Sequence, residues 1–318
     1  MVFFITALRA LAACLITNAH YTGVYPTDLI ANGGLIGDVL FFAVSGYCLY
    51  NVRLSFPRWY GKRLVRCYLP VLIITGIYML FGFYSLETHN AAWWYLYPTY
   101  YHFVASIVVL YIPYYILMRC EFLKNKLGIV AVVVAIAYAI VYIFAFDKSS
   151  YTIDNVRSPM IWFIFFESML LGAYFRQNDE KFRNRFSWWM PLMALVTFAA
   201  YFFSKSYLMK QANFLNYQFI NQVVIFALLY FLFRTFAGID SKLEKLPNWI
   251  KGVINFIAEL TLEIYVVQYV IIDAFRDLVF PYNWFLITLF IIASAFVLHK
   301  VCGFILGLVD KIFKKEKI

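Results

Sequence analysis

Runs of about twenty apolar residues recur along the whole chain and leave few folds open to it. Ten such runs lie at roughly 3–22, 31–50, 67–84, 100–118, 127–146, 158–175, 189–204, 214–236, 253–275 and 284–308. Each is long enough to cross a bilayer as a helix, whereas the strands of a membrane barrel are shorter and alternate in polarity. Only 14% of the residues are charged, too few for the surface of a water-soluble domain. The sequence predicts an all-α, polytopic membrane helical bundle of about ten transmembrane helices, forming a single domain over residues 1–318.

The basic residues alternate between the loops. Twenty of the 27 Lys and Arg residues fall in five segments, at 51–66, 119–126, 176–186, 234–251 and 309–318. Cytoplasmic loops carry an excess of Lys and Arg. We therefore expect these segments and both termini to be cytoplasmic, in a multi-pass protein of a bacterial cytoplasmic membrane. The net charge of +10 follows from this pattern, so the lipid bilayer is the expected partner and nucleic acid is not.

The cysteines are scattered and predict neither a metal site nor a disulfide framework. They occupy positions 14, 48, 67, 120 and 302. No Cys-x-x-Cys pair and no His/Cys spacing suits zinc. We expect no metal cofactor.

Several polar residues lie inside the apolar runs. Arg9 and His20 share the first run, eleven residues apart, which is about 16 Å and close to three turns of one helix. Other runs contain Asp38, Ser45, Glu167, Gln218, Asn221, Gln222, Glu259, Glu263, Gln268, Asp273 and His299. Ionisable residues in a membrane usually face a bundle interior or a wet cavity and indicate function. By contrast, Gln218, Asn221 and Gln222 share one helix face and are expected chiefly to join helices.

A basic motif precedes the third run. Arg63 and Arg66 are three residues apart, so their side chains lie on one side of a helix. Two guanidinium groups that converge suit a phosphate or pyrophosphate. The alternative is ordinary positive charge on the cytoplasmic side, in contact with lipid headgroups.

An aromatic cluster is expected on the opposite side of the membrane. It comprises Trp93, Trp94, Tyr95, Tyr97, Tyr100 and Tyr101. Trp and Tyr prefer the headgroup level, so an interfacial belt is one interpretation. A stacking platform for a sugar ring is the other.

Three motifs in order resemble those of the acyltransferase 3 family of integral-membrane acyltransferases. Arg9 and His20 are similar to its Arg-x10-His pattern, and residues 41–47 (FFAVSGY) to its Phe-Phe-x-x-Ser-Gly-aromatic signature. Residues 63–66 (RLVR) resemble its Arg-x-x-Arg. Weaker similarities lie at 167–175 and 260–268. Two departures are that Val39 stands where the family often has an acid, with Asp38 one residue earlier, and that Gln268 replaces a family histidine.

The resemblance implies transfer of an acyl group, most commonly acetyl, from cytoplasmic acyl-coenzyme A to a hydroxyl of a carbohydrate. Succinyl or another acyl group is also open. Acyl-coenzyme A would be a co-substrate, with its phosphates held by Arg63 and Arg66 and its path lined by Arg9. His20 would deprotonate the acceptor hydroxyl or be transiently acylated. Supporting roles are expected for Asp38, Ser45 and Glu167, with Ser45 considered as an oxyanion donor.

The acceptor would be a cell-surface or lipid-linked glycan such as an exopolysaccharide, O-antigen or capsule. Two other functions fit a polar bundle. A multi-span glycosyltransferase would usually need a large extracytoplasmic loop, and none is present in the sequence. A transporter or flippase for a lipid-linked glycan or small solute could use the same residues as a proton relay. However, the chain shows no two-fold repeat of hydropathy, and Arg63-x-x-Arg66 would have no evident purpose there.

Overall fold

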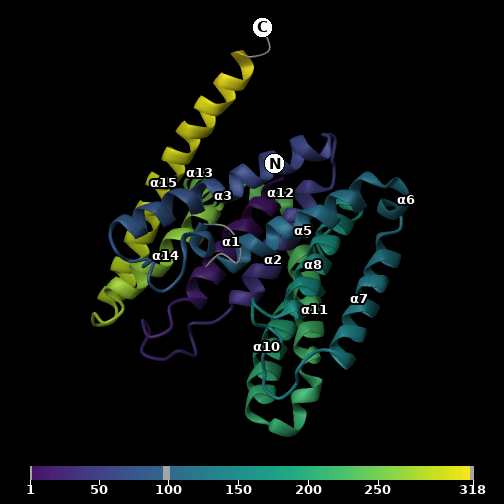
Figure 1. Ribbon diagram of the computed structural model, residues 1–318. Helices are drawn as coiled ribbons and strands as arrows, with labels where there is room; N and C mark the ends of the chain where they lie inside the picture. The colour runs from purple at the N-terminus through teal and green to yellow at the C-terminus, as the bar shows by residue number, and fades with distance from the viewer. Residues whose placement is uncertain (1, 96–100, 316–318) are drawn as a thin grey trace. The chain divides into compact units, whose positions relative to one another are not determined.

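The computed structural model describes residues 2–95 and 101–315. Within these ranges the chain forms helices and no strand (Figure 1). The predicted all-α class is therefore confirmed. Tyr97 and Tyr100 of the aromatic cluster, and Lys317 of the basic tail, lie outside the described residues.

Six helices in the described part of the chain are long and apolar enough to cross a membrane. They are α3 (Phe56–Leu80), α5 (His102–Arg119), α7 (Leu127–Phe144), α10 (Trp189–Lys210), α11 (Phe219–Gly238) and α15 (Tyr282–Lys315). Two shorter apolar helices are α1 (Phe3–Ala19) and α2 (Gly34–Leu49). These helices fit a multi-pass membrane protein. The count of ten spans and the cytoplasmic termini stay predictions.

The predicted run 253–275 is divided between two helices. α13 (Asn248–Glu259) ends just before Leu260, and α14 (Thr261–Phe275) begins just after it. The hydroxyl of Thr261 donates to the backbone carbonyl of Ala258 at 2.9 Å. Bonds of the same kind occur inside continuous helices, from Thr235 to Phe231 in α11 and from Ser168 to Ile164 in α8 (Pro159–Gln177), so the Thr261 bond alone does not explain the break. An interruption of one residue does not change the apolar pattern that predicted one continuous span.

The chain divides into two compact units. The first comprises Met1–Ala12, Leu35–Phe56 and Val109–Asn255, and the second comprises Ala13–Gly34, Pro57–Val108 and Phe256–Ile318. The division falls within α1, which continues from one unit into the other. The expectation of a single domain stays a prediction.

In the first unit, α10 and α11 pack side by side, as do α7 and α8 (Figure 1). Buried amides join these helices. Gln222 accepts a hydrogen bond from the Tyr138 hydroxyl and donates to the carbonyl of Ile153 at 2.9 Å. Asn221 donates to the carbonyl of Tyr201 at 3.0 Å. The interhelical role expected for this polar face is confirmed.

Two glycines let α2 and α8 cross at very short range. A Cβ atom placed on Gly46 would lie 2.1 Å from the carbonyl oxygen of Met169, and one on Gly172 would lie 1.8 Å from that of Ala43. Small residues at membrane helix crossings permit such approach of the backbones. Tyr114 of α5 donates to the carbonyl of Gly46 at 2.6 Å. The Ser-Gly-Tyr part of the 41–47 motif is therefore placed where α2 packs most tightly.

In the second unit, α14 packs against α15 and receives two tyrosine hydroxyls. Tyr78 of α3 donates to the carbonyl of Val267 at 2.8 Å, and Tyr101 donates to that of Val266 at 3.0 Å. Because both tyrosines are buried, these bonds fix α3 and the residue before α5 against the middle of α14. α14 also contacts His20, the residue that follows α1, through the ring of Tyr269.

Candidate functional site

The predicted site residues are divided between the two units. His20, Arg63 and Arg66 belong to the second unit. Arg9, Asp38, Ser45 and Glu167 belong to the first. Arg9 and His20 are connected through α1, whose last residue, Ala19, directly precedes His20.

His20 is half-buried at the end of α1. Its ring packs edge-on against the ring of Tyr269, with 4.9 Å between the ring centroids and 71° between the planes. Its backbone N–H donates to the carbonyl of Thr17 at 3.0 Å. The imidazole is thus supported on one side by α14.

The loop after α1 is held by Asn18. Its side-chain amide donates to the carbonyls of Ile30 at 2.8 Å and Asn32 at 2.9 Å. Its side-chain oxygen accepts from the hydroxyl of Tyr25 at 2.7 Å. An Asn at a helix end often bonds the backbone of the following loop in this way. These three bonds determine the path of the chain directly after His20.

In the described part of the second unit, the carboxylate of Glu263 pairs with His299 and not with His20. Glu263 of α14 lies 2.9 Å from Nδ1 of His299 on α15. In the described residues of that unit, no carboxylate lies within ion-pair distance of His20. The Glu263–His299 pair was not predicted from the sequence, because residues 36 positions apart on two helices give no local signal of pairing.

Arg63 and Arg66 lie in the first turns of α3. The guanidinium carbon of Arg63 lies 5.9 Å from the ring centroid of Trp59, which is buried. A cation over an indole is attracted to the face of the ring. Arg63 is half-buried and Arg66 is exposed. Within the described part of the second unit, neither is paired with a carboxylate, so both guanidinium groups are available to an anion.

The first unit buries acidic groups on α2 and α8. Asp38 is buried, while Ser45 and Glu167 are half-buried. One carboxylate oxygen of Glu167 is buried and has no hydrogen-bond partner among the described residues. Arg9 is half-buried on α1. A buried carboxylate oxygen without a hydrogen-bond partner, like that of Glu167, is rare in native proteins and calls for an explanation.

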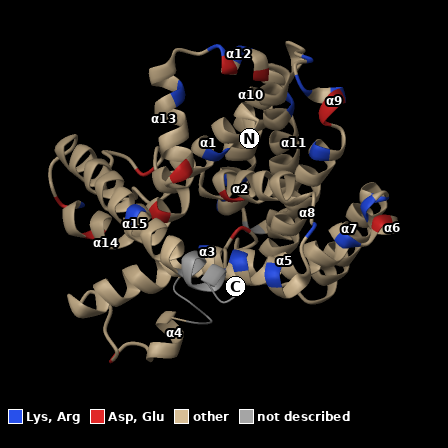
Figure 2. Ribbon diagram, turned by 90° about the horizontal axis from the view of Figure 1, so that it is seen from above, with Lys and Arg blue, Asp and Glu red and all other residues tan. Residues whose placement is uncertain are grey.

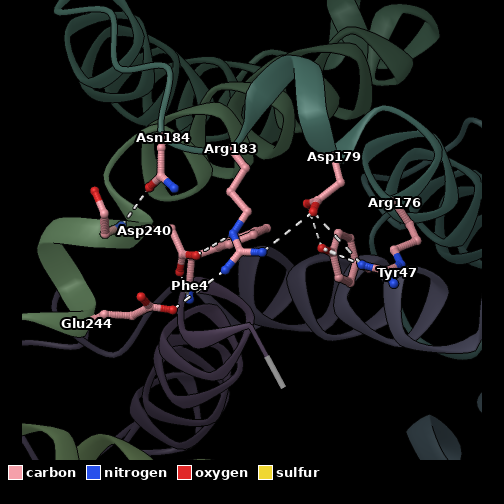
Figure 3. Close-up of polar contacts among 9 residues, drawn as sticks. Phe4, Tyr47, Arg176, Asp179, Arg183, Asn184, Asp240 and Glu244 are labelled. Atoms are coloured by element: carbon pink, nitrogen blue, oxygen red, sulfur yellow. Dashed lines mark hydrogen bonds and ion pairs between the residues drawn. The ribbon is translucent and has the colours of Figure 1, made fainter.

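The structure adds a charged cluster that the sequence analysis missed. Asp240, the first residue of α12 (Asp240–Glu244), is fully buried and accepts from the backbone N–H of Phe4 at 2.8 Å (Figure 3). It also accepts from Nε of Arg183 at 2.6 Å. The first N–H groups of a helix lack partners within the helix and favour a negative charge nearby. Asp240 therefore caps α1, which carries Arg9.

Arg183 extends this cluster to α9 (Asp179–Phe182). It lies 3.9 Å from Asp179 and 3.6 Å from Glu244, and its hydrogen bond to Asp240 raises its pKa. Asp179 in turn accepts from the hydroxyl of Tyr47 at 2.7 Å (Figure 3). Figure 2 shows the mixed acidic and basic residues of α9 and α12. The aromatic residue of the 41–47 motif is thereby joined to the cap of α1.

A pocket of 390 Å³ lies at the end of α8 in the same unit. It is lined by Tyr50, Asn51 and residues 176–181. The lining contains two cations, Arg176 and Lys181, and two acids, Asp179 and Glu180. This balance of charge does not favour a polyanion. In the described part of the chain, no group of three or more His, Cys, Asp or Glu side chains is placed to hold a metal ion.

The aromatic cluster forms stacked pairs in the second unit. The ring of Trp94 stacks on that of Tyr84 with 4.2 Å between centroids, and that of Trp93 stacks on His89 with 3.7 Å. Trp94 also donates to the carbonyl of Ser85 at 3.1 Å. Trp93 and Trp94 therefore stack on residues of the preceding loop, whereas Tyr101 packs on α14. The choice between a belt and a sugar platform stays open.

Comparison with known families agrees with the motifs. The profile of the acyltransferase 3 family, which describes an acyltransferase domain, matches residues 2–299. The chain belongs to this family, and the resemblance drawn from the three motifs is confirmed. No curated protein and no solved structure matches the chain.

Proposed function

We propose that this membrane acyltransferase transfers an acyl group, most commonly acetyl, from cytoplasmic acyl-coenzyme A to a hydroxyl of a cell-surface or lipid-linked carbohydrate. The acceptor would be an exopolysaccharide, O-antigen, capsule or similar glycan, and the protein would act in the bacterial cytoplasmic membrane. The observation that carries the proposal is the family match over residues 2–299, together with His20 and Arg63-x-x-Arg66 in one compact unit.

Arg63 and Arg66 bind the phosphates of the donor in this proposal. Coenzyme A carries several negative charges, and a guanidinium forms two parallel hydrogen bonds with a phosphate. Contact with Trp59 holds Arg63 near the start of α3, and neither arginine is paired with a carboxylate in the described part of its unit. A role for Arg9 on the donor path stays an expectation from the family resemblance.

His20 acts as the general base. A neutral imidazole nitrogen takes the proton of the acceptor hydroxyl while the hydroxyl oxygen bonds to the thioester carbonyl carbon. The carbon–sulfur bond then breaks, and the leaving thiolate takes the proton from the imidazolium. Packing against Tyr269 orients the ring. In the alternative path the acyl group passes first to His20 and then to the acceptor.

Supporting roles for Asp38, Ser45 and Glu167, with Ser45 as a hydrogen-bond donor to the oxyanion, stay expectations from the family resemblance. Glu167 has a buried oxygen without a partner among the described residues. Such an oxygen is satisfied when a ligand or water donates to it.

The proposal is tested on the surface glycan of the host. Glycans from cells with the wild-type gene, with His20→Ala and with no copy are compared by mass spectrometry, with Lys245→Ala as the control because Lys245 is exposed at the end of α12. We expect one acyl unit on the glycan in wild type and Lys245→Ala, and its loss in the other two. The mass of the unit identifies the acyl group. Identical glycans in all four strains would refute the proposal.

Affinity for coenzyme A distinguishes an acyltransferase from a transporter. Purified protein should bind coenzyme A, whereas a flippase for lipid-linked glycan should not. A protein that transports glycan and shows no affinity for coenzyme A would establish the alternative.

A further inference from the structure

Gln268 is a buried amide without partners. Its side chain is fully buried in α14, and neither its oxygen nor its nitrogen has a hydrogen-bond partner among the described residues. Gln218, Asn221 and Gln222 are equally buried, yet their amides are hydrogen-bonded. Burial of an unbonded amide is unfavourable. The exception at Gln268 points to a group outside the chain, a ligand or an ordered water, as its hydrogen-bond partner.

The neighbours of Gln268 connect it to His20 and to α3. The next residue, Tyr269, packs against the ring of His20. The preceding residue, Val267, accepts the hydroxyl of Tyr78 at 2.8 Å. Gln268 is therefore within one residue, along α14, of both contacts.

Two threonine hydroxyls in the same unit are also buried and have no hydrogen-bond partner among the described residues. Thr75 lies one turn before Tyr78 on α3, is fully buried, and its Oγ1 has no partner among the described residues. Thr17 lies one turn before His20, and its Oγ1 is likewise buried and unbonded within the described chain. Together these side chains offer hydrogen-bond donors and acceptors and no charge. They suit a neutral ligand with amide or hydroxyl groups.

The position of Thr75 along α3 favours the donor over the acceptor. Arg63 precedes Thr75 by twelve residues on α3, which is about 18 Å along the helix axis. With its phosphates at Arg63, a coenzyme A would need its pantetheine arm to span a distance of this order to bring the thioester to His20. That arm contains two neutral amides between the pyrophosphate and the sulfur. The N–H of one of these amides can donate to Oε1 of Gln268, and the carbonyl of the other can accept from its Nε2.

We infer that Gln268, together with Thr75, binds the amides of the pantetheine arm and so positions the thioester at His20. The inference rests on the proposed donor. Gln268 is thus a positioning residue for the donor, and the acceptor binds elsewhere.

The test uses coenzyme A and pantetheine as probes, because neither depends on the acyl group or the acceptor. Affinity is measured from ligand-induced thermal stabilisation of the purified protein. We expect Gln268→Leu to weaken binding of both probes about tenfold, as for one or two lost hydrogen bonds. Arg63→Gln with Arg66→Gln should weaken coenzyme A and leave pantetheine unchanged, because pantetheine has no phosphate.

Stability without ligand separates a binding role from a structural one. Gln268→Leu removes an unbonded amide, so its melting temperature should equal or exceed that of wild type. The matched control is Gln222→Leu, which removes an amide with two partners and should lower the melting temperature. Thr75→Val provides a second variant of nearly constant volume, with the same expected loss of affinity and no loss of stability.

Three results would overturn the inference. The first is wild-type affinity of Gln268→Leu for both probes. The second is a melting temperature of Gln268→Leu as low as that of Gln222→Leu. The third is a loss of affinity of Gln268→Leu for the acceptor alone. Failure of the wild-type protein to bind coenzyme A would instead refute the proposed function itself. The two failures are therefore distinguishable.

Discussion

Gly172→Ala should disrupt the crossing of α2 and α8. The added Cβ would lie 1.8 Å from the carbonyl oxygen of Ala43, 2.7 Å from its carbonyl carbon and 2.8 Å from the backbone nitrogen of Tyr47. A Cβ essentially never approaches another heavy atom closer than 3.0 Å. The atoms must therefore separate by about 1.2 Å, the difference between 3.0 and 1.8 Å. No side-chain rotation can provide this, because the contacts belong to the backbone of α2.

The energetic cost follows from that displacement. Overpacking a well-packed interior typically costs about 1–3 kcal/mol, and more where the neighbours cannot yield. A gap of up to about 1 Å also removes a quarter to a half of the dispersion attraction at each affected contact. We expect a loss of about 3 kcal/mol for Gly172→Ala, or roughly 6–12 °C in the unfolding midpoint.

Thermal unfolding of the purified protein in detergent measures this change. The matched control is Gly128→Ala in α7, where an added Cβ meets no atom within 4 Å. Alanine is the better helix former, by up to about 1 kcal/mol, so this control should melt at or above the wild-type midpoint. A midpoint of Gly172→Ala equal to that of the control would refute the packing argument.

Three further variants test the parts of the site. Asp240→Ala leaves the cap of α1 and the side chain of Arg183 without their buried acceptor, and should cost about 2 kcal/mol; an unfolding midpoint like that of wild type would contradict the capping role. Asn18→Ala releases the loop after the proposed base, so kcat should fall while coenzyme A affinity stays constant. Reduced affinity with unchanged kcat would contradict this assignment. Replacing both Arg63 and Arg66 by Gln should weaken coenzyme A about 10–100-fold, as isothermal titration would show, and unchanged affinity would remove their phosphate role.

The helices could be predicted from the sequence because their signal is local. Apolar runs of membrane-spanning length predict helices, since each residue bonds within its own segment. The break at Leu260 was missed because it interrupts the helix for one residue only. Hydropathy averages over a window, and a break of this length does not change that average.

The site could be predicted only in part. Arg63 and Arg66 could be proposed as phosphate-binding residues because their spacing and charge are visible in the sequence, and this role stays a prediction. The cap of α1 could not, because Phe4 and Asp240 are 236 residues apart. The polarity of Gln268 was visible in its apolar run, but the absence of a partner is a property of the fold.

Gly46 and Gly172 show the same limit of prediction from the sequence. Small residues are expected where membrane helices cross, yet the chain has 14 glycines. The sequence does not indicate which of them meet another helix. Only the fold places Gly46 against Met169 and Gly172 against Ala43.

The central claim is that His20 removes the proton of the acceptor hydroxyl. It is tested most directly by comparing wild type with His20→Ala in membranes that contain the host glycan, measuring coenzyme A thiol released from acetyl-coenzyme A. The account predicts a fall in turnover of about 10²–10⁴-fold, with coenzyme A affinity unchanged. Turnover within tenfold of wild type would contradict it.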